Sequence, residues 1–267
     1  AIVGATGNVG RKTLEVLEKK EFKIDNLYLV ASSKSAGTKI KFRDQEHNVI
    51  DLDNFDFAKA KIIFFAAGGK ISEKFAEKAA KDSLVIDNSS YYRMDPNVPL
   101  IVPQVNSEAL KNIKKNIIAN PNCSTAQLVM ALSPLHKEFN IKRVITSTYQ
   151  AVSGAGKEAM DELFNQTKKI YVNDPVEKSV FTKQIAFNVI PHIDIFMSDG
   201  FTKEEVKMRE ETKKILDENI EVVAHCVRVP VFVGHSESVF IETYNPIDED
   251  VARDVLRESE GVIVIDH

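Results

Sequence analysis

Short apolar runs alternate with helical patterns in the first half of the chain. The run Ile62-Ile63-Phe64-Phe65-Ala66-Ala67 is apolar on both faces, as in a strand buried within a mostly parallel sheet that helices cover. Similar runs predict strands at 1–3, 26–31, 84–87 and 100–102, and helical spacing of apolar residues predicts helices at 11–20 and 72–81. Strands that alternate with helices are typical of a doubly wound α/β fold, so we expect a Rossmann-type dinucleotide-binding domain over residues 1–121.

The second half has a different pattern. An apolar helix is predicted after residue 123 and is expected to stop at Ser133-Pro134, and a helix from 203 to about 219 is expected to open with a capping box at Thr202. Further patterns predict strands at 143–150, 221–229 and 237–244 and a helix at 157–169. We therefore expect an α+β domain with a mixed sheet, for catalysis and dimerisation, over residues 122–267.

Composition is that of a soluble globular protein of two domains. The chain has 267 residues, 43% hydrophobic and 28% charged, and its net charge of −4 is spread along its length. This balance favours neither a nucleic-acid partner nor a membrane surface, and no apolar run approaches the ~20 residues that span a bilayer. Only two cysteines in a chain of this length indicate a reducing compartment, so we expect a cytoplasmic protein. The sequence predicts no metal site. The chain starts inside a strand and ends on the strand-like run 261–267, from which we expect a C-terminal portion to be missing.

A glycine-rich turn follows the first strand. Glycines at positions 4, 7 and 10 let the backbone turn tightly, at the start of a helix whose free N–H groups attract a pyrophosphate. The residues predicted to bind the cofactor here are Gly4, Thr6, Gly7, Asn8, Val9 and Gly10.

The end of the second strand indicates which dinucleotide binds. An NAD site would place a carboxylate there to hold the ribose 2′-hydroxyl, whereas this chain has Ser32, Ser33, Lys34 and Ser35. Hydroxyls and a cation suit a 2′-phosphate, so we expect NADP. The alternative is an ordinary polar loop.

Cys123 stands where the polar turn Asn120-Pro121-Asn122 runs into an apolar helix. Free backbone N–H groups and the helix dipole stabilise a thiolate at such a position, which favours a nucleophilic cysteine. The alternative is a small buried side chain in a capping turn.

Candidate partners for this thiol follow it in the sequence. Gln150 ends a strand just before a glycine-rich bend that includes Ser153 and Gly154, and such a bend permits close approach to a flat ligand ring. Arg228 ends an apolar strand face and needs an anion, while His235 follows a glycine and can titrate near neutral pH. Glu204 and Lys207 share one side of a helix, and pattern alone favours an ordinary exposed ion pair.

Several of these motifs, in this order, resemble the aspartate-β-semialdehyde dehydrogenases over nearly the whole chain. The matching stretches are 4–10, 32–37, 87–90, 93–96, 120–125, 150–156, 187–192, 204–207 and 228–237. The resemblance implies the NADPH-dependent reduction of L-aspartyl-4-phosphate to L-aspartate 4-semialdehyde, with release of phosphate, on the route to diaminopimelate, lysine, threonine and methionine. It also implies a homodimer, with a tetramer as the alternative.

The resemblance also implies roles for particular residues. Cys123 matches the nucleophile that forms a thioester, His235 the general acid/base, and Gln150 the amide that holds the reacting group. The residues that match the substrate site are Arg228 for the α-carboxylate, Glu204 for the amino group, and Arg93, Asn122 and Lys207 for phosphate. Lys34 stands where relatives often have Arg. Lysine keeps the positive charge but lacks the planar guanidinium group that donates two parallel hydrogen bonds.

Two other functions are compatible with parts of this pattern. A related acyl-phosphate reductase, such as the N-acetylglutamyl-phosphate enzyme, has a similar plan but needs no partner for a free amino group, so Glu204 favours the aspartyl substrate. A non-catalytic scaffold descended from the enzyme would require an unreactive Cys123.

Overall fold

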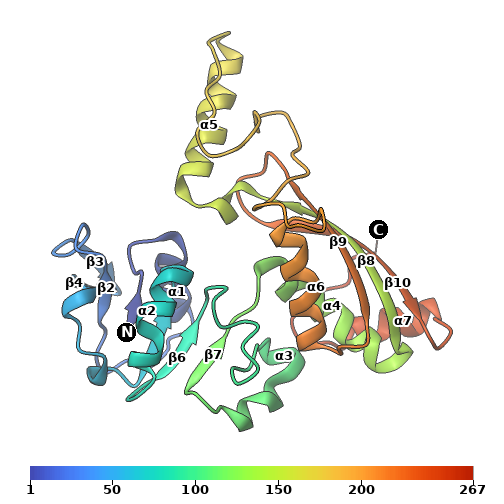
Figure 1. Ribbon diagram of the computed structural model, residues 1–267, viewed down its shortest axis with the longest axis horizontal. Helices are drawn as coiled ribbons and strands as arrows, with labels where there is room; N and C mark the ends of the chain where they lie inside the picture. The colour runs from blue at the N-terminus through green and yellow to red at the C-terminus, as the bar shows by residue number, and fades with distance from the viewer. Residues whose placement is uncertain (267) are drawn as a thin grey trace. The chain divides into compact units, whose positions relative to one another are not determined.

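The structure is a computed structural model that describes residues 1–266 and divides into two compact units. One unit is Ala1–Pro121 and the other begins at Asn122 (Figure 1). Each unit has a sheet of its own, with seven strands in the first and three in the second. No helix within 1–266 has both the length and the apolar character that crossing a bilayer requires.

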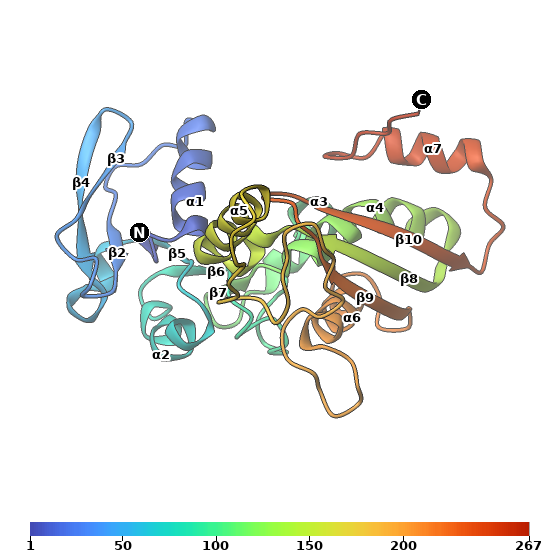
Figure 2. The ribbon, with the colours of Figure 1, turned by 90° about the horizontal axis from the view of Figure 1, so that it is seen from above.

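The first unit is a mostly parallel sheet with helices on both faces. Its strands are β1 Ile2–Val3, β2 Leu29–Ala31, β3 Lys39–Phe42, β4 Gln45–Asp51, β5 Ile62–Phe65, β6 Leu84–Asp87 and β7 Ile117–Ala119. They lie in the order β3-β4-β2-β1-β5-β6-β7, and only β3 pairs in the antiparallel sense. Helices α1 Asn8–Lys19 and α2 Gly69–Ala79 lie on opposite sides of the sheet (Figure 2). The predicted Rossmann-type topology is thus confirmed.

Three features of the first unit differ from the sequence prediction. The β3–β4 hairpin and β7 were not predicted, because β3 and β7 are short and the strands β3 and β4 are mixed in polarity. The predicted strand at 100–102 is wrong: only Leu100 forms an isolated bridge, to Ala119. Pro99 and Pro103 flank this segment and have no N–H groups to continue a ladder, and Pro103 instead starts the short helix α3 Pro103–Asn106.

The second unit has the expected mixed sheet. Its strands are β8 Ile141–Gln150, β9 Glu221–Arg228 and β10 His235–Thr243, in the order β10-β8-β9. Strand β10 runs antiparallel to β8, and β9 runs parallel to it. Helices α4 Cys123–Phe139 and α6 Lys203–Ile215 cover one face, where Leu128, Val144, Met208 and Ala224 form part of a buried core (Figure 1). Helices α5 Lys157–Tyr171 and α7 Glu249–Arg257 complete this unit.

Three predictions in the second unit are corrected. Helix α4 does not stop at Pro134 but continues to Phe139, because buried Leu132 and Phe139 anchor both sides of the proline and outweigh its missing N–H. His235 is the first residue of β10 rather than part of the preceding bend. The run 262–266, expected to be a strand, has no strand partner among the described residues.

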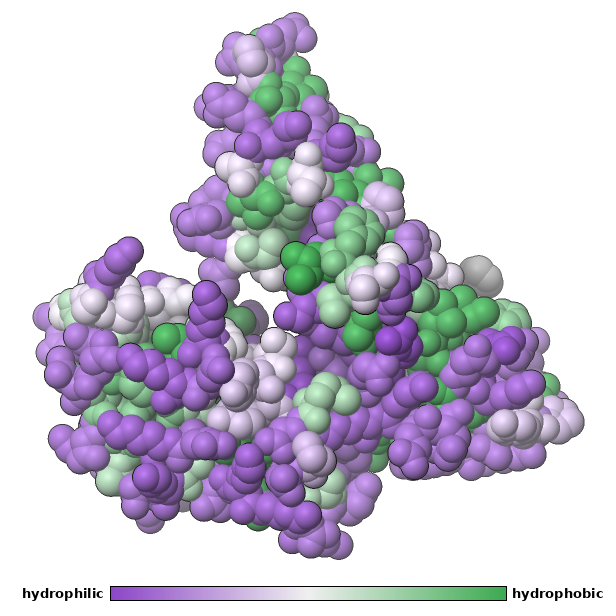
Figure 3. Space-filling view, viewed as in Figure 1, coloured by the Kyte–Doolittle hydropathy of each residue, from purple (hydrophilic) through white to green (hydrophobic). Residues whose placement is uncertain are grey.

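The sheet face opposite α4 and α6 is apolar and open. Ile145 on β8 pairs with Val223 on β9 and Phe240 on β10, so the three side chains form one row across the sheet. Each of the three is at least 40% exposed. Figure 3 shows apolar side chains gathered on the part of the surface where these strands lie.

A buried carboxylate orders the loop that follows α5. Glu162 accepts hydrogen bonds from the backbone N–H of Ser179 at 3.0 Å, from the Ser179 hydroxyl at 2.8 Å, and from the N–H of Val180. Gln166, one turn further on, donates to Glu162 and accepts from the N–H groups of Ile185 and Ala186. The two side chains therefore satisfy backbone groups of a loop that has no sheet partner in this region.

Replacing Glu162 by glutamine is expected to loosen this loop. Burial alone would raise the pKa of Glu162, but the hydrogen bonds from Val180 and Ser179 outweigh it and leave the pKa lowered. A lowered pKa in the folded state means that the ionised carboxylate stabilises the fold above its unfolded pKa, and that this contribution is lost as pH falls through the folded value. Glu162→Gln should therefore cost about 1–3 kcal/mol near pH 7 and much less near pH 3.

Urea unfolding of both proteins at pH 7 and pH 3 measures this difference, and limited proteolysis reports cleavage within 173–186. The exposed Glu158→Gln on the same helix is the control. Equal stability of Glu162→Gln and wild type at pH 7 would contradict the assignment.

Candidate functional site

Three candidate residues lie in one row across the second sheet. His235 on β10 pairs with Gln150 on β8, and Gln150 pairs with Arg228 on β9. Paired residues of neighbouring strands point to the same face of a sheet, here the face that α4 and α6 cover. The sheet register thus brings together residues that are up to 85 positions apart in the chain.

Cys123 faces the end of this row. It is the first residue of α4, and its Sγ lies 3.1 Å from Nε2 of His235. Asn122 is the N-cap residue, because its side-chain oxygen accepts the N–H of Ser124 at 2.9 Å. The thiol therefore sits at the helix N-terminus, as predicted, within contact distance of an imidazole.

A backbone hydrogen bond fixes the protonation of His235. The N–H of Ala151 donates to Nδ1 at 3.0 Å, so Nδ1 carries no proton and the neutral ring bears its proton on Nε2, toward the sulfur. Burial and the nearby Arg228 guanidinium lower the pKa of His235, against a smaller opposite effect of Gly234 and Glu204. The imidazole is thus set up to donate a hydrogen bond to Sγ.

The prediction of a low thiol pKa at Cys123 is wrong for this structure. Cys123 is exposed at its surface, yet desolvation by the surrounding protein raises the pKa of its thiol, and the Glu204 carboxylate raises it further. Hydrogen bonds from the backbone of Ser124 and Cys123 act in the predicted direction but are outweighed. The helix N-terminus therefore only partly offsets the increase in the thiol pKa that burial and Glu204 cause.

A chain of polar contacts links the start of α4 to α6. Asn122 donates from Nδ2 to Glu204 at 2.8 Å, and Lys207 Nζ lies 3.2 Å from the other Glu204 oxygen and 2.7 Å from Asp194. The interpretation of Glu204 and Lys207 as an exposed pair is wrong, since Glu204 is only 5% exposed. Glu211 of the same helix accepts the backbone N–H of Asn122 at 2.6 Å, which fixes the position of the residue before the thiol.

The remaining side chains of the row are buried. Arg228 is 6% exposed and donates from Nη1 to the carbonyl of Ala151 at 2.6 Å. Gln150 turns its amide inward, where Nε2 donates to the hydroxyl of Thr148 at 3.1 Å. A Cβ added at Gly154 would stand 3.2 Å from Nη1 of Arg228 and within 4 Å of the His235 ring, so this glycine packs against the row. Ser153 precedes it, with its N–H bonded to the carbonyl of Phe232.

The first unit contains the glycine-rich turn at the start of α1. Gly4 has φ of +89°, and a Cβ there would meet the Ala66 carbonyl at 2.6 Å, while a Cβ at Gly10 would meet the Gly4 carbonyl at 2.3 Å. Helix α1 has no side chain on its N-cap Gly7 and no acidic residue in its first turn, which holds Asn8 and Val9. The backbone N–H groups there are free of an internal anion, so these residues fit a dinucleotide pyrophosphate.

The candidate ribose-phosphate loop follows β2 directly. Ser32 accepts the N–H of Ser35 in a tight turn, and Ser32, Ser33 and Lys34 are exposed. No carboxylate lies within this turn, and Thr6 of the glycine turn belongs to the same edge of the sheet, beyond β1.

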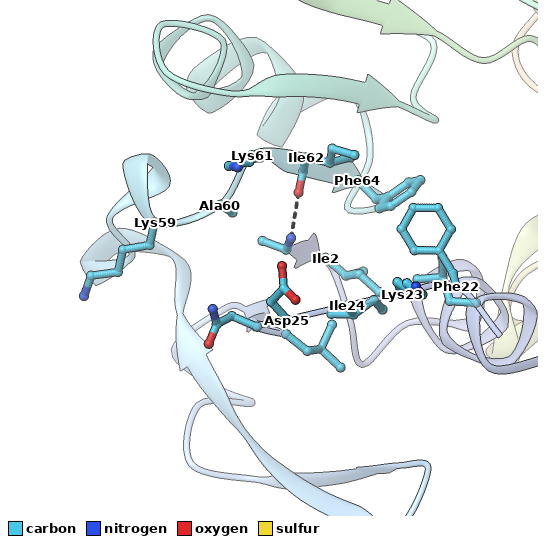
Figure 4. A pocket seen from close by; sticks show the side chains of 14 residues that line it. Ile2, Phe22, Lys23, Ile24, Asp25, Lys59, Ala60, Lys61, Ile62 and Phe64 are labelled. Atoms are coloured by element: carbon cyan, nitrogen blue, oxygen red, sulfur yellow. Dashed lines mark hydrogen bonds between the residues drawn. The ribbon is translucent and has the colours of Figure 1, made fainter.

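Two cavities of the first unit lie at opposite edges of its sheet. One, of about 330 Å³, is lined by Val9 and by Ala66, Asn88 and Asn120, which follow the carboxyl ends of their strands. The other, of about 230 Å³, lies around Ala1, Asp25 and Lys61 at the amino ends of the strands (Figure 4). Ligands of open parallel sheets bind at the carboxyl edge, so the first cavity is the one relevant to the cofactor.

Arg93 lies near the same edge of the first unit. It is 8% exposed and donates from Nε to the carbonyl of Asn120 at 2.9 Å and from Nη2 to the carbonyl of Asn88 at 3.1 Å. These bonds hold the guanidinium at the ends of β6 and β7.

Three polar residues around the thiol were not predicted: Glu211, Gln127 and Glu237. Glu211 follows Glu204 by seven residues, so a search for carboxylates on the apolar stripe of α6 would have found it. Gln127 and Glu237 meet only through tertiary packing, and no local pattern identifies them.

Comparison with known proteins agrees with this arrangement. A family model described as the NAD binding domain of semialdehyde dehydrogenase matches residues 1–113, and one described as its dimerisation domain matches residues 132–267. The aspartate-semialdehyde dehydrogenase of Aquifex aeolicus is 54% identical over 272 residues, an alignment that covers 100% of this chain and 80% of the relative.

Solved structures give the same result. Aspartate semialdehyde dehydrogenase II of Vibrio cholerae, complexed with ASA, has a TM-score of 0.96 at 48% identity and covers 97% of this chain and 78% of its own. The Candida albicans enzyme with NADP has a TM-score of 0.69 at 29% identity, over 96% of this chain and 75% of its own. The chain therefore belongs to the aspartate-semialdehyde dehydrogenase family.

Proposed function

We propose that this chain catalyses the NADPH-dependent reduction of L-aspartyl-4-phosphate to L-aspartate 4-semialdehyde through a thioester on Cys123, in the biosynthesis of diaminopimelate, lysine, threonine and methionine. The observation that carries the proposal is the 3.1 Å contact between Sγ of Cys123 and Nε2 of His235, at the end of the row that contains Gln150 and Arg228. A thiol and an imidazole at this distance are suited to nucleophilic acyl transfer.

Cys123 acts as the nucleophile. The thiol first loses its proton to solvent, to which Cys123 is exposed. The thiolate sulfur then attacks the acyl carbon, phosphate leaves with the electrons of the C–O bond, and a thioester remains on the protein. The Nε2–H of His235 stabilises the sulfur anion before the attack. It then donates to the oxygen that becomes negative, which stabilises the charge that develops in the transition state.

The cofactor supplies the hydride that reduces the thioester. Gly4, Gly7 and Gly10 with Thr6, Asn8 and Val9 are the residues of the first unit that fit its pyrophosphate, and Ser32, Ser33, Lys34 and Ser35 those that fit a 2′-phosphate. When the carbon–sulfur bond breaks, the oxyanion left by hydride transfer becomes the aldehyde carbonyl and the electrons of the bond return to the sulfur. The Nε2–H of His235 again stabilises the sulfur anion, so the same donor serves both halves of the reaction.

Buried charges around the thiol suit an amino-acid substrate. Arg228 keeps donors beyond the one bound to Ala151, and a guanidinium fork matches the α-carboxylate. Glu204, 5% exposed, carries the negative charge for the α-amino group, and Lys207 and Asn122 beside it suit a phosphate oxygen. The assignment of Arg93 to phosphate rests on the resemblance to the family alone. An N-acetylated substrate such as N-acetylglutamyl phosphate has no ammonium group, so a buried Glu204 favours the aspartyl substrate over that alternative.

The open sheet face of the second unit favours a homodimer. The exposed row Ile145, Val223 and Phe240 would be covered by the same face of a second copy, and the match to a family dimerisation domain supports this. A tetramer is the alternative. The two unpaired cysteines of the described residues, with a reduced nicotinamide cofactor, favour a cytoplasmic location.

An assay in the reverse direction tests the proposal. Aspartate semialdehyde, phosphate and NADP are expected to give phosphate-dependent absorbance of NADPH at 340 nm, and N-acetylglutamate semialdehyde is expected to give none above background. Dependence on arsenate or phosphate separates thioester phosphorolysis from simple aldehyde oxidation. No phosphate-dependent reduction with either aldehyde would refute the assignment.

Lys34→Glu tests the cofactor preference in the same assay. A carboxylate in this exposed loop repels a 2′-phosphate and can accept a bond from a 2′-hydroxyl, so KM for NADP is expected to rise about tenfold or more while KM for NAD falls or stays constant. Lys20→Glu, exposed at the far end of α1, is the matched charge control. A parallel change in both KM values would count against a 2′-phosphate contact.

A further inference from the structure

A second row of side chains lies directly beside the catalytic row. Glu237 on β10 pairs with Thr148 on β8, and Thr148 pairs with Cys226 on β9. These residues are two positions from His235, Gln150 and Arg228 respectively, so they point to the same face of the sheet. The first row has an assigned chemistry, whereas the carboxyl of Glu237 in the second row does not.

Helix α4 contacts both rows. Gln127 lies four residues after Cys123 and is therefore one turn further along the same helix face. Its Nε2 donates to Oε1 of Glu237 at 2.8 Å, just as Cys123 Sγ contacts His235 at 3.1 Å. The helix and β10 are thus joined by two successive contacts on neighbouring turns of α4.

The Glu237 carboxyl is not satisfied by this bond. Its Oε2 is buried and has no hydrogen-bond partner among the described residues. Burial raises the pKa of Glu237 to about 7, against the opposite effect of the bond from Gln127. The carboxyl therefore changes its charge close to neutral pH.

The nearest ionisable groups on this face of the sheet belong to the two rows. Cys226 is in the same row as Glu237, and its thiol pKa is raised by burial and, to a smaller extent, by the carboxylates of Glu204, Glu205 and Glu237. His235 lies two positions away on the same strand and contacts Cys123 of α4. The thiol and the imidazole of the first row are the groups whose protonation the reaction requires.

We propose that Glu237 is a positioning residue for the Cys123–His235 pair. Glu237 holds α4 against β10 through Gln127, and the charge of the Glu237 carboxyl alters the reactivity of the Cys123 thiol. The inference rests on the proposed role of Cys123 as nucleophile. Two parts of it are separable, because the bond to Gln127 and the negative charge can be removed one at a time.

The sign of the charge effect follows from electrostatics. An ionised Glu237 places a negative charge near the thiol and disfavours the thiolate, whereas a neutral Glu237 does not. Below pH 6 the carboxyl is protonated and its replacement by glutamine changes no charge. Above pH 8 the same replacement removes a negative charge.

Alkylation of Cys123 by iodoacetamide, measured by mass spectrometry from pH 5.5 to 9, tests the charge effect without substrate or cofactor. The rate ratio of Glu237→Gln to wild type is expected to be near 1 at pH 5.5 and to rise about three- to tenfold by pH 8.5. The rise should have its midpoint near pH 7. Glutamine keeps an oxygen to accept from Gln127, so the tie to α4 remains.

Gln127→Ala removes the tie and keeps the charge. It is expected to lower kcat about tenfold or more with KM for the aldehyde nearly unchanged, because the misplaced thiol affects the chemical step. Its alkylation profile should retain the step near pH 7 that Glu237→Gln lacks. A role in folding alone would change neither the pH profile nor the split between kcat and KM.

Controls separate these effects from general ones. Glu138→Gln, exposed in the last turn of α4, makes the same chemical change about 22 Å from the thiol and should follow the wild-type profile. Cys123→Ala gives the background from Cys226, whose thiol is buried and whose pKa burial raises to about 12. A rate ratio for Glu237→Gln that is constant across pH, or Gln127→Ala with wild-type kcat, would overturn the proposal. A Cys123 that no pH alkylates would instead refute the nucleophile itself.

Discussion

Replacement of Cys123 by alanine is expected to abolish turnover while the protein still folds and binds NADPH. The sulfur forms the covalent intermediate, so without it the acyl group has no acceptor, and the loss of kcat should be about 10⁴-fold or more. Cys123 packs little of the core, since it is exposed at the surface of the second unit. Turnover is measured by phosphate-dependent NADP reduction, folding by circular dichroism, and NADPH binding by fluorescence titration.

The chain offers a matched control in its other cysteine. Cys226 is fully buried in the core beside Met208, so Cys226→Ala should cost stability and leave turnover within about threefold of wild type. Cys123→Ala with near-normal phosphate-dependent NADP reduction would remove the proposed nucleophile.

Replacement of Arg228 by lysine is expected to raise KM for aspartate semialdehyde about 10- to 100-fold with a smaller change in kcat. In the wild type, Nη1 of Arg228 donates to the carbonyl of Ala151 at 2.6 Å, which leaves other guanidinium donors for the carboxylate. Lysine keeps the positive charge but has a single nitrogen. It cannot donate to Ala151 and also form two parallel hydrogen bonds with a carboxylate. The loss of one charged hydrogen bond of about 1.5–3 kcal/mol sets this range.

Steady-state kinetics with varied aldehyde at saturating phosphate and NADP measure the two constants separately. Arg253→Lys on α7 is the corresponding control, because Arg253 is a half-buried arginine paired with Glu249 away from the row. This substitution should change neither constant. If KM of Arg228→Lys equals that of wild type, the guanidinium is structural and another cation holds the carboxylate.

The parts of the fold that depend on local pattern were predictable from the sequence. The buried strands β5 and β6 and the helices α1 and α2 follow from the pattern of apolar residues. The capping box at Thr202 was found because it depends on two residues three positions apart. The β3–β4 hairpin was missed because its strands have alternating, mostly polar faces, and Pro134 misled because tertiary packing overrides its local preference.

The members of the site were easier to predict than their chemistry. Residue type and neighbouring glycines or caps pointed to Cys123, Arg228 and His235. The thiol pKa was predicted with the wrong sign, because the desolvation and the charge of Glu204 come from elements more than 80 positions away. For the same reason, no pattern in the sequence could indicate that the N–H of Ala151 sets the tautomer of His235.

The register of β10 constrains how the family can vary in length. Strand positions alternate between faces, so an odd insertion near the start of β10 would turn His235 to the open side and present Ser236 to the thiol. The chain does carry such an irregularity, but at the opposite end, where Thr243 pairs with Ile141 and Lys142 is passed over. Evolutionary insertions and deletions should therefore collect around residues 142 and 243, while the spacing from His235 to Glu237 stays invariant.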